Sequence, residues 1–273
     1  MPHVVIEPHR GWRGIDIKEL VEYRDLLWFM TWRNIKVRYA QSAIGVGWAI
    51  VQPVVSMLVY TVIFGNLVGV RTDGDVPYAL FTVAALVPWT YFATTMNDCG
   101  NSMLSSRQII SKIYFPRLIL PLAIIGSKLI DFAIAAVILG LLMVVYGAEP
   151  TWGVLILPWL VVVMTAAASG IGLMLAALAI QYRDIAYGMQ FGVQMLMYAA
   201  PVVYPATLVP EKYQQLYALN PMVGVIEGFR AALLGGRPMP WDAIITGSVV
   251  ALVLFSIGIS FFRRKEHVFA DVA

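Results

Sequence analysis

Long uncharged runs alternate with short polar segments along most of this chain. Five runs contain no charged residue, and each reaches the roughly 20 residues that a helix needs to cross a bilayer. They are 40–70, 76–97, 151–182, 185–210 and 243–262. A sixth run, 118–148, is interrupted only by Lys128 and Asp131. The pattern predicts an all-α integral membrane protein with six transmembrane helices.

The segment between the fifth and sixth runs, about 207–235, is too apolar for a loop and too broken for a span. Pro210 and Pro221 each stand where a first helical turn would start, Asn220 is a good N-cap, and Gly235 begins a Gly-Gly stop. We expect two short re-entrant helices of about two and four turns. Such helices are tolerated at membrane depth only where protein or water covers their ends, which is typical of a transporter.

Residues 1–39 form a polar segment of mixed charge, and without an apolar core before residue 40 we expect an uncleaved first span. Within it, 16–38 has helical periodicity. The apolar face is Ile17, Leu20, Val21, Leu27 and Trp28. Aromatic rings followed by basic residues favour an amphipathic interfacial helix on the cytoplasmic leaflet. A helix packed on a partner chain would show the same pattern.

Basic residues set the expected topology. Fourteen of the nineteen Lys and Arg residues fall in segments that six spans place on one side. We therefore expect both termini in the cytoplasm, with 1–39 and the tail 263–273 flanking a six-span membrane domain over 40–262. Because topology accounts for the basic residues, they give no reason to expect nucleic-acid binding.

The connection 100–116 also has a helical pattern, which places three isoleucines together beside basic residues. They are Ile109, Ile110 and Ile113, flanked by Arg107 and Lys112. A short helix presented to the cytoplasm between two spans suits docking to another protein. A surface helix without a partner is the alternative.

Two pairs of opposite charges stand three residues apart, and so each pair shares one helical face. We expect Lys128 and Asp131 to form an ion pair inside the bundle, with proton or ion coupling as the alternative.

Glu227 and Arg230 lie in the second short helix, where they could pair within or between protomers and latch an external gate. Phe229 belongs to the apolar face that would seal it. A helix lying in the outer headgroups would also have such a face.

The chain has no sequence of the form G-x-x-x-x-G-K-[ST], so it offers no ATP site of that kind. Ion coupling normally needs several buried carboxylates, and a separate docked ATPase is the simpler energy source. We expect no enzyme activity and no metal. The three histidines lie in polar terminal segments, and the single Cys99 has no companion ligands.

Six segments together resemble the ABC-2 type permeases that export polysaccharides. They are RNIKVRYAQSAIGVGWAIVQP (33–53), KIYFPRLILPL (112–122), YRDIAYGMQF (182–191), APVVYP (200–205), LYALNPMVGVIEGFRAALLG (216–235) and FRRKEHVFADV (262–272). The resemblance covers nearly the whole chain.

This resemblance implies a homodimer in the bacterial inner membrane that binds two ATPase subunits, which would hold ATP and magnesium. It also implies a cargo built on undecaprenyl pyrophosphate, with the O-antigen exporters the best fit and capsule or teichoic acid exporters the alternatives. By the same resemblance 100–116 is the coupling helix and 207–235 the external gate. The rival class is a non-ABC channel or secondary carrier.

A sugar polymer needs a neutral path rich in aromatic rings. The candidates are Trp48, Tyr60, Phe64, Trp89, Tyr91, Gln194, Met195, Tyr198 and Tyr204. Each ring could equally pack in the core or face lipid. The pyrophosphate needs cations, for which Arg33, Lys36 and Arg38 are available. Candidates for ATPase coupling are Arg107, Ile109, Ile110, Lys112 and Arg183.

Overall fold

The computed structural model describes residues 17–40, 45–72, 76–110, 112–182 and 184–266, and these residues are all-helical apart from their connections. The longer helices are α2 (Arg24–Tyr39), α3 (Trp48–Tyr60), α4 (Tyr78–Gly100), α7 (Ile119–Tyr146), α8 (Leu157–Ala179), α9 (Asp184–Tyr198), α11 (Pro221–Leu234) and α12 (Trp241–Lys265). The shorter ones are α1 (Ile17–Glu22), η1 (Gly45–Gly47), η2 (Thr61–Leu67), α5 (Ser102–Ser105), α6 (Arg107–Ile110), η3 (Trp152–Ile156), η4 (Ala206–Leu208) and α10 (Glu211–Ala218).

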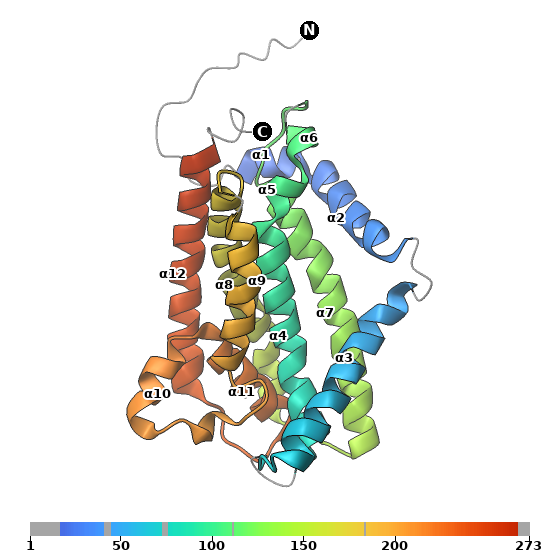
Figure 1. Ribbon diagram of the computed structural model, residues 1–273, viewed down its shortest axis with the longest axis vertical. Helices are drawn as coiled ribbons and strands as arrows, with labels where there is room; N and C mark the ends of the chain where they lie inside the picture. The colour runs from blue at the N-terminus through green and yellow to red at the C-terminus, as the bar shows by residue number, and fades with distance from the viewer. Residues whose placement is uncertain (1–16, 41–44, 73–75, 111, 183, 267–273) are drawn as a thin grey trace.

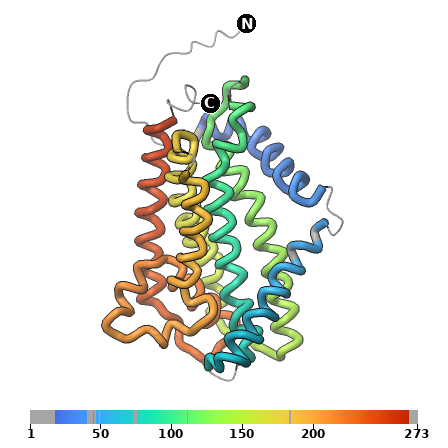
Figure 2. Tube along the Cα trace, in the orientation of Figure 1, coloured from blue at the N-terminus to red at the C-terminus, as the bar shows by residue number. Residues whose placement is uncertain are grey.

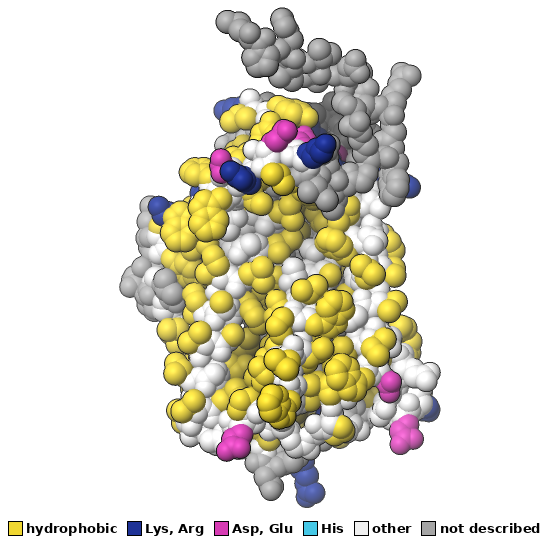
Figure 3. Space-filling model, turned by 180° about the vertical axis from the view of Figure 1, so that it is seen from behind, with side chains coloured by type: hydrophobic (Ala, Val, Ile, Leu, Met, Phe, Trp, Pro, Cys, Tyr) yellow, Lys and Arg dark blue, Asp and Glu magenta, His cyan; other side chains and the backbone are white. Residues whose placement is uncertain are grey.

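The long helices form one bundle whose two ends differ (Figure 1). Helices α1, α5 and α6 gather at one end, here called the α1 end, where α12 also finishes. Helices α10 and α11 lie at the opposite end, called the α10 end. Helices α4, α7, α8 and α12 run along the bundle between these ends, and the shorter α3 and α9 follow it for part of its length (Figure 2). Hydrophobic side chains cover the middle of the molecule, and charged ones gather towards its two ends (Figure 3).

Five helices in the described part are long and apolar enough to cross a membrane. They are Ile50–Leu67, Tyr78–Gly100, Ile119–Tyr146, Trp152–Ala179 and Trp241–Lys265. The fifth predicted span is shorter than expected, because α9 has only 15 residues, about 22 Å against a hydrocarbon core of about 30 Å. The uncharged run continues to Pro210, but Pro201 and Pro205 lie in irregular chain that follows the helix. Five spans, rather than six, therefore meet the length criterion.

Helix α4 forms the centre of the bundle, because 89% of its most apolar stretch is buried. It packs against α7, α8 and α11. Helix α8 also packs very closely against α12. A Cβ on Gly170 would lie 2.6 Å from the carbonyl of Leu254, and Gly258 of α12 lies against Gly170. The small residues of 166–172 thus serve packing, as small residues do between membrane helices.

The two short helices of 207–235 are confirmed, with 8 residues in α10 and 14 in α11. Asn220 caps α11 by accepting from the Met222 amide, and Gly235 has a positive φ of 66° at the other end. Their junction packs against α12, where Pro221 lies against Gly247, and re-entry into the membrane stays a prediction. Twelve residues of α11 are buried, which contradicts the alternative of a helix lying in the outer headgroups.

The predicted continuous helix over 16–38 is broken into α1 and α2, because Tyr23 leaves the helical conformation at φ −95° and ψ 18°. Its single predicted apolar face also divides. Leu20 and Leu27 pack against the bundle, whereas the side chains of Val21 and Trp28 are exposed. Ile17 begins α1, and residues 1–16 lie outside the described residues.

Candidate functional site

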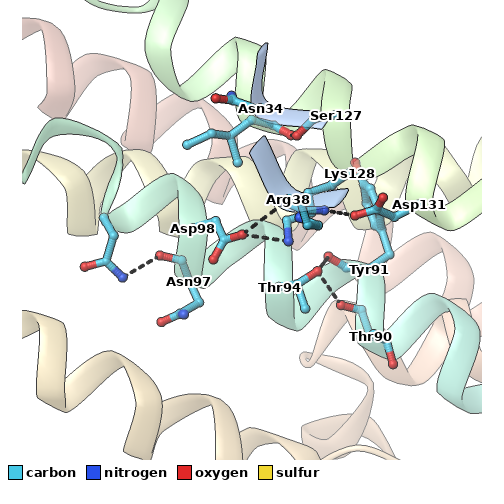
Figure 4. Close-up of polar contacts among 12 residues, drawn as sticks. Asn34, Arg38, Thr90, Tyr91, Thr94, Asn97, Asp98, Ser127, Lys128 and Asp131 are labelled. Carbon is cyan, nitrogen blue, oxygen red and sulfur yellow. Dashed lines mark hydrogen bonds and ion pairs between the residues drawn. The ribbon is translucent and has the colours of Figure 1, made fainter. Parts of the chain in front are cut away.

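Four charged side chains meet where α2, α4 and α7 approach one another near the α1 end (Figure 4). We call Arg38, Asp98, Lys128 and Asp131 the charged quartet. The Lys128 ammonium lies 2.6 Å from the Asp98 carboxylate, and Arg38 lies between Asp98, at 3.6 Å, and Asp131, with which it pairs directly. Tyr39 donates to Asp131 over 2.7 Å. Two cations and two anions make the quartet neutral.

The expected ion pair between Lys128 and Asp131 is wrong, since each residue pairs with another helix. Both lie on one side of α7, but Asp98 reaches Lys128 from α4 and Arg38 reaches Asp131 from α2. Asp98 is the residue that sequence reasoning missed. Its signal was a carboxylate at the end of a buried span, which requires a cation within reach.

A cavity of about 420 Å³ lies beside the quartet, between α3, α4 and α7. Its lining combines the ring of Trp48, the amide of Gln52 and the hydroxyl of Thr94 with Lys128 and Asp131. Because each charge of the quartet already has a partner, the cavity offers hydroxyl, amide and ring contacts without net charge. Such a lining suits a neutral polar group better than an isolated ion.

The candidate path residues occupy different environments within the chain. Trp89 and Tyr91 are buried in the core, and the Tyr91 hydroxyl lies 2.9 Å from that of Thr165. Trp48, on α3, is half exposed. Gln194, Met195 and Tyr198 are exposed on α9.

Three further path candidates are partly buried towards the α10 end. The rings of Tyr60 and Phe64 stand 6.0 Å apart, and the Tyr204 hydroxyl lies 3.0 Å from that of Tyr217. Burial, then the hydrogen bond to Tyr204, raises the pKa of Tyr217 above its usual value, so this hydroxyl stays neutral. The side chains available to a passing molecule are thus those of α3 and α9.

The three candidate cations for a lipid headgroup differ in their contacts. Arg38 belongs to the quartet, where two carboxylates compensate its charge. Arg33 donates to the Asn34 side chain, and the Lys36 ammonium lies 6.0 Å from the centre of the Trp32 ring. Of the three candidate cations, Arg33 and Lys36 are therefore the two that lie outside the charged quartet.

The connection 100–116 is not the single helix that was expected, because the chain leaves helical geometry at Ser106 and divides into α5 and α6. The isoleucines also separate. Ile110 is buried and Ile109 packs beside the same cluster, whereas Ile113 is 63% exposed. With Tyr114, which is 77% exposed, Ile113 forms an apolar projection that we call the 113–114 tip.

The polar candidates around that connection are described only in part. Lys112 is exposed next to the 113–114 tip, and Arg107 begins α6. Arg183 lies outside the described residues. Whether these side chains meet an ATPase stays a prediction.

At the α10 end, Glu227 and Arg230 form a buried ion pair of 2.9 Å within one protomer. Arg230 also donates to the carbonyls of Val202 at 2.9 Å and Phe81 at 3.2 Å, and its guanidinium lies over the Phe81 ring. Sequence reasoning missed Arg237, which reaches the second Glu227 oxygen at 2.8 Å. Phe229 is buried against Phe132 of α7. The cluster thus ties α11 to α4 and to the chain after α9.

Among the described residues, no three His, Cys, Asp or Glu side chains gather where they could hold a metal ion. Both polar clusters consist of paired charges, drawn from three helices in the quartet and from α11 with the connection after it at the α10 end.

Comparison with known proteins adds to this geometry. The chain is 27% identical to the O-antigen export system permease protein RfbA of Myxococcus xanthus, over 93% of its own length and 98% of that protein. It is also 27% identical to RfbA of Klebsiella pneumoniae, over 91% and 95%. The polysialic acid transport protein KpsM of Escherichia coli is 24% identical over 86% and 91%. The model of the ABC-2 type transporter family matches residues 25–234, and the chain therefore belongs to the ABC-2 type transporter family, as a membrane-spanning transport subunit.

Proposed function

We propose that this chain is the permease subunit of an ATP-driven exporter that moves a lipid-linked polysaccharide, O-antigen in the first place, across the bacterial inner membrane. The observation that carries the proposal is the full-length similarity to permeases named for O-antigen export. A capsule polymer is the second candidate, because the polysialic acid transport protein KpsM also matches this chain. It ranks second because the match covers a smaller share of the chain.

The α1 end is the cytoplasmic end in this proposal. Three basic residues close α12 there, and Lys112 lies in the same region, which agrees with the excess of positive charge in cytoplasmic loops. Two nucleotide-binding subunits, carrying ATP and magnesium, would dock at this end. The exposed apolar 113–114 tip supports docking there, because a partner would bury its two side chains.

A second copy of the chain would complete the transport path. Only 6% of the apolar stretch of α3 is buried within the protomer, and α9 exposes Gln194, Met195 and Tyr198. Membrane helices use such surfaces against lipid or another subunit. A path between two copies would combine rings with an amide, contacts that fit the apolar faces and hydroxyl edges of sugars.

The pyrophosphate end of the cargo would meet cations at the cytoplasmic interface. Arg33 and Lys36 carry this part of the proposal, because two carboxylates already compensate Arg38. The exposed rings of Trp28, Phe29 and Trp32 on the same helix suit the headgroup layer, where aromatic side chains are enriched.

The external gate is proposed to be the pair α10 and α11. Helix α11 is fixed in the protomer by Arg230 and its buried face. Helix α10 has no buried residue, so it is the more movable member of the pair. Glu227 and Arg230 hold the fixed member in place.

The test is deletion of this chain in its own host, followed by complementation. We expect loss of surface O-antigen and accumulation of the lipid-linked polymer in the cytoplasm, with recovery by the wild-type chain. A catalytically inactive variant of the co-expressed ATPase should prevent that recovery. Normal O-antigen with loss of a capsule would instead assign the chain to the second candidate.

A further inference from the structure

A groove lies under α10, bounded by α8, α9 and α12. Its volume is about 470 Å³, and its lining is apolar apart from a few polar atoms. Representative side chains are Ile171 of α8, Leu196 of α9, Ala199 directly after α9, Leu216 of α10 and Leu254 of α12. We call it the α10 groove.

The groove lies within the length of the membrane-spanning helices. Leu254 is 13 residues from the first residue of α12, which places it about 20 Å along that helix from the α10 end. The groove thus begins near the α10 end and reaches towards the middle of the bilayer. Hydrocarbon is the surrounding medium at this depth, and an apolar groove open to it is not filled by water.

A cation lies beside the groove on the same helix. The Lys212 ammonium stands 4.6 Å from the centre of the Tyr213 ring, and Tyr213 lines the groove. Both residues lie in the first turn of α10. The acyl chain of a lipid placed in the groove would contact the apolar lining, and its headgroup, beside this turn, would meet the positive charge of Lys212.

The apolar side of helix α10 that faces the groove is open to such an occupant. None of its residues is buried, and the exposed fraction of Leu216 is 67%. An empty groove would deprive the apolar side of the helix of contact atoms. A chain of methylene groups supplies those contacts without requiring the hydrogen bonds that a polar occupant would.

We propose that the α10 groove binds one acyl chain of a membrane phospholipid, with the anionic headgroup of that lipid at Lys212. The bound lipid holds α10 against α9 and α12. This inference rests on the membrane spans and does not depend on the cargo; the orientation proposed above makes the leaflet the outer one.

The experiment uses the full-length chain in nanodiscs of phosphatidylglycerol and phosphatidylethanolamine, without ATPase or polysaccharide. A phosphatidylglycerol probe with a photoreactive group on its acyl chain is added, and labelled peptides are identified by mass spectrometry. We expect labelling of α10 and of α12 around Leu254. Since the readout needs no transport, its failure is distinct from failure of the proposed export function.

Variants test the acyl-chain site and the headgroup site separately. Ala199→Phe fills the groove and should abolish labelling there, whereas Ala133→Phe, at an exposed alanine of α7, should leave it unchanged. Lys212→Gln should lower the preference for phosphatidylglycerol about fivefold, the worth of roughly one basic residue near an anionic surface. Lys212→Arg should retain that preference.

Three results would overturn the inference. Labelling spread evenly over lipid-facing helices would mean that no specific site exists. Displacement of the probe by polyprenyl phosphate, but not by excess phosphatidylglycerol, would assign the groove to a polyprenyl chain. Crosslinks through Leu216 to a second copy would make it a protein interface.

Discussion

Lys128 has a side chain only 8% exposed, within the apolar helix α7, and its ammonium group pairs with the Asp98 carboxylate. Its partner Asp98 is 40% exposed, and so protein encloses the pair only in part. Charges in such positions are retained when they are paired, because removing one partner leaves the other without compensation. The pairing thus holds α4 and α7 in register near the α1 end.

Replacing Asp98 with Asn should lower the free energy of unfolding by about 2 kcal/mol. This is less than the roughly 3–5 kcal/mol of a fully buried pair, because Asp98 is partly exposed. Thermal unfolding in detergent measures the loss, and the further change Lys128→Met should recover much of it. If the double variant is as unstable as Asp98→Asn alone, the unpaired ammonium is not the cause.

Exchange of Lys128 and Asp131 distinguishes this network from a pair within α7. The exchange would place a carboxylate beside Asp98 and a cation beside Arg38, so we expect it to lower stability further than Asp131→Asn does. A melting temperature restored by the exchange would favour the pair predicted from sequence. Both variants are compared in the same detergent.

Arg230 donates to the carbonyl of Val202, in the irregular chain after α9, and to that of Phe81 in α4. Its side chain is 3% exposed and reaches Val202 and Phe81 as well as Glu227. Arg230→Met should therefore lower stability by about 3 kcal/mol or more, since several buried acceptors lose a charged donor. Arg237→Met, whose side chain is 24% exposed, is the control and should cost clearly less. Equal losses would contradict the role given to Arg230.

At the scale of elements, the sequence predicts the helix starts and ends that depend on neighbouring residues. Asn220 and Pro221 start α11 and Gly235 ends it, because capping and chain reversal depend on neighbouring residues. Hydrophobic runs likewise located the long spans. The length of α9 was overestimated, since an uncharged run does not reveal where its helix stops.

The candidate site was predicted less well than the fold, because its contacts join distant segments. Asp98 and Lys128 are thirty positions apart, and Arg38 and Asp131 are 93 apart. Spacing along one helix suggested a local pair, whereas helix packing decided the actual partners. Burial of Ile110 beside exposed Ile113 similarly depends on the turn at Ser106.

The contact between α8 and α12 tests packing at this scale. Gly170→Ala should destabilise the protein, because the added Cβ would lie 2.6 Å from backbone atoms of α12 that cannot move independently. Gly140→Ala in α7 is the matched control, since its Cβ would meet nothing within 4 Å and alanine favours a helix. Unfolding midpoints in detergent should fall for the first variant alone. A similar midpoint for both would mean that the helices separate easily at Gly170.

At the scale of the whole molecule, the two ends are organised differently. The α10 end is fixed by the buried cluster around Arg230, whereas the α1 end presents the exposed 113–114 tip. A force applied at that tip reaches the bundle through α5, α6 and α7, which are continuous with it in sequence. Helix α2 joins the same region through Arg38. The arrangement suits an input of force from a docked partner at the α1 end and an opening of the transport path at the α10 end.

The last prediction concerns that input. Ile113→Asp combined with Tyr114→Asp should reduce copurification of the ATPase about tenfold or more, because two exposed apolar side chains of a docking surface are replaced by solvated charges. Stability should stay near wild type, since both residues are exposed. Ile110→Asp should instead destabilise the chain, because Ile110 is buried. Leu208→Asp, at an exposed leucine of the α10 end, should change neither property. Undiminished copurification of the double variant would place the docking surface away from the 113–114 tip.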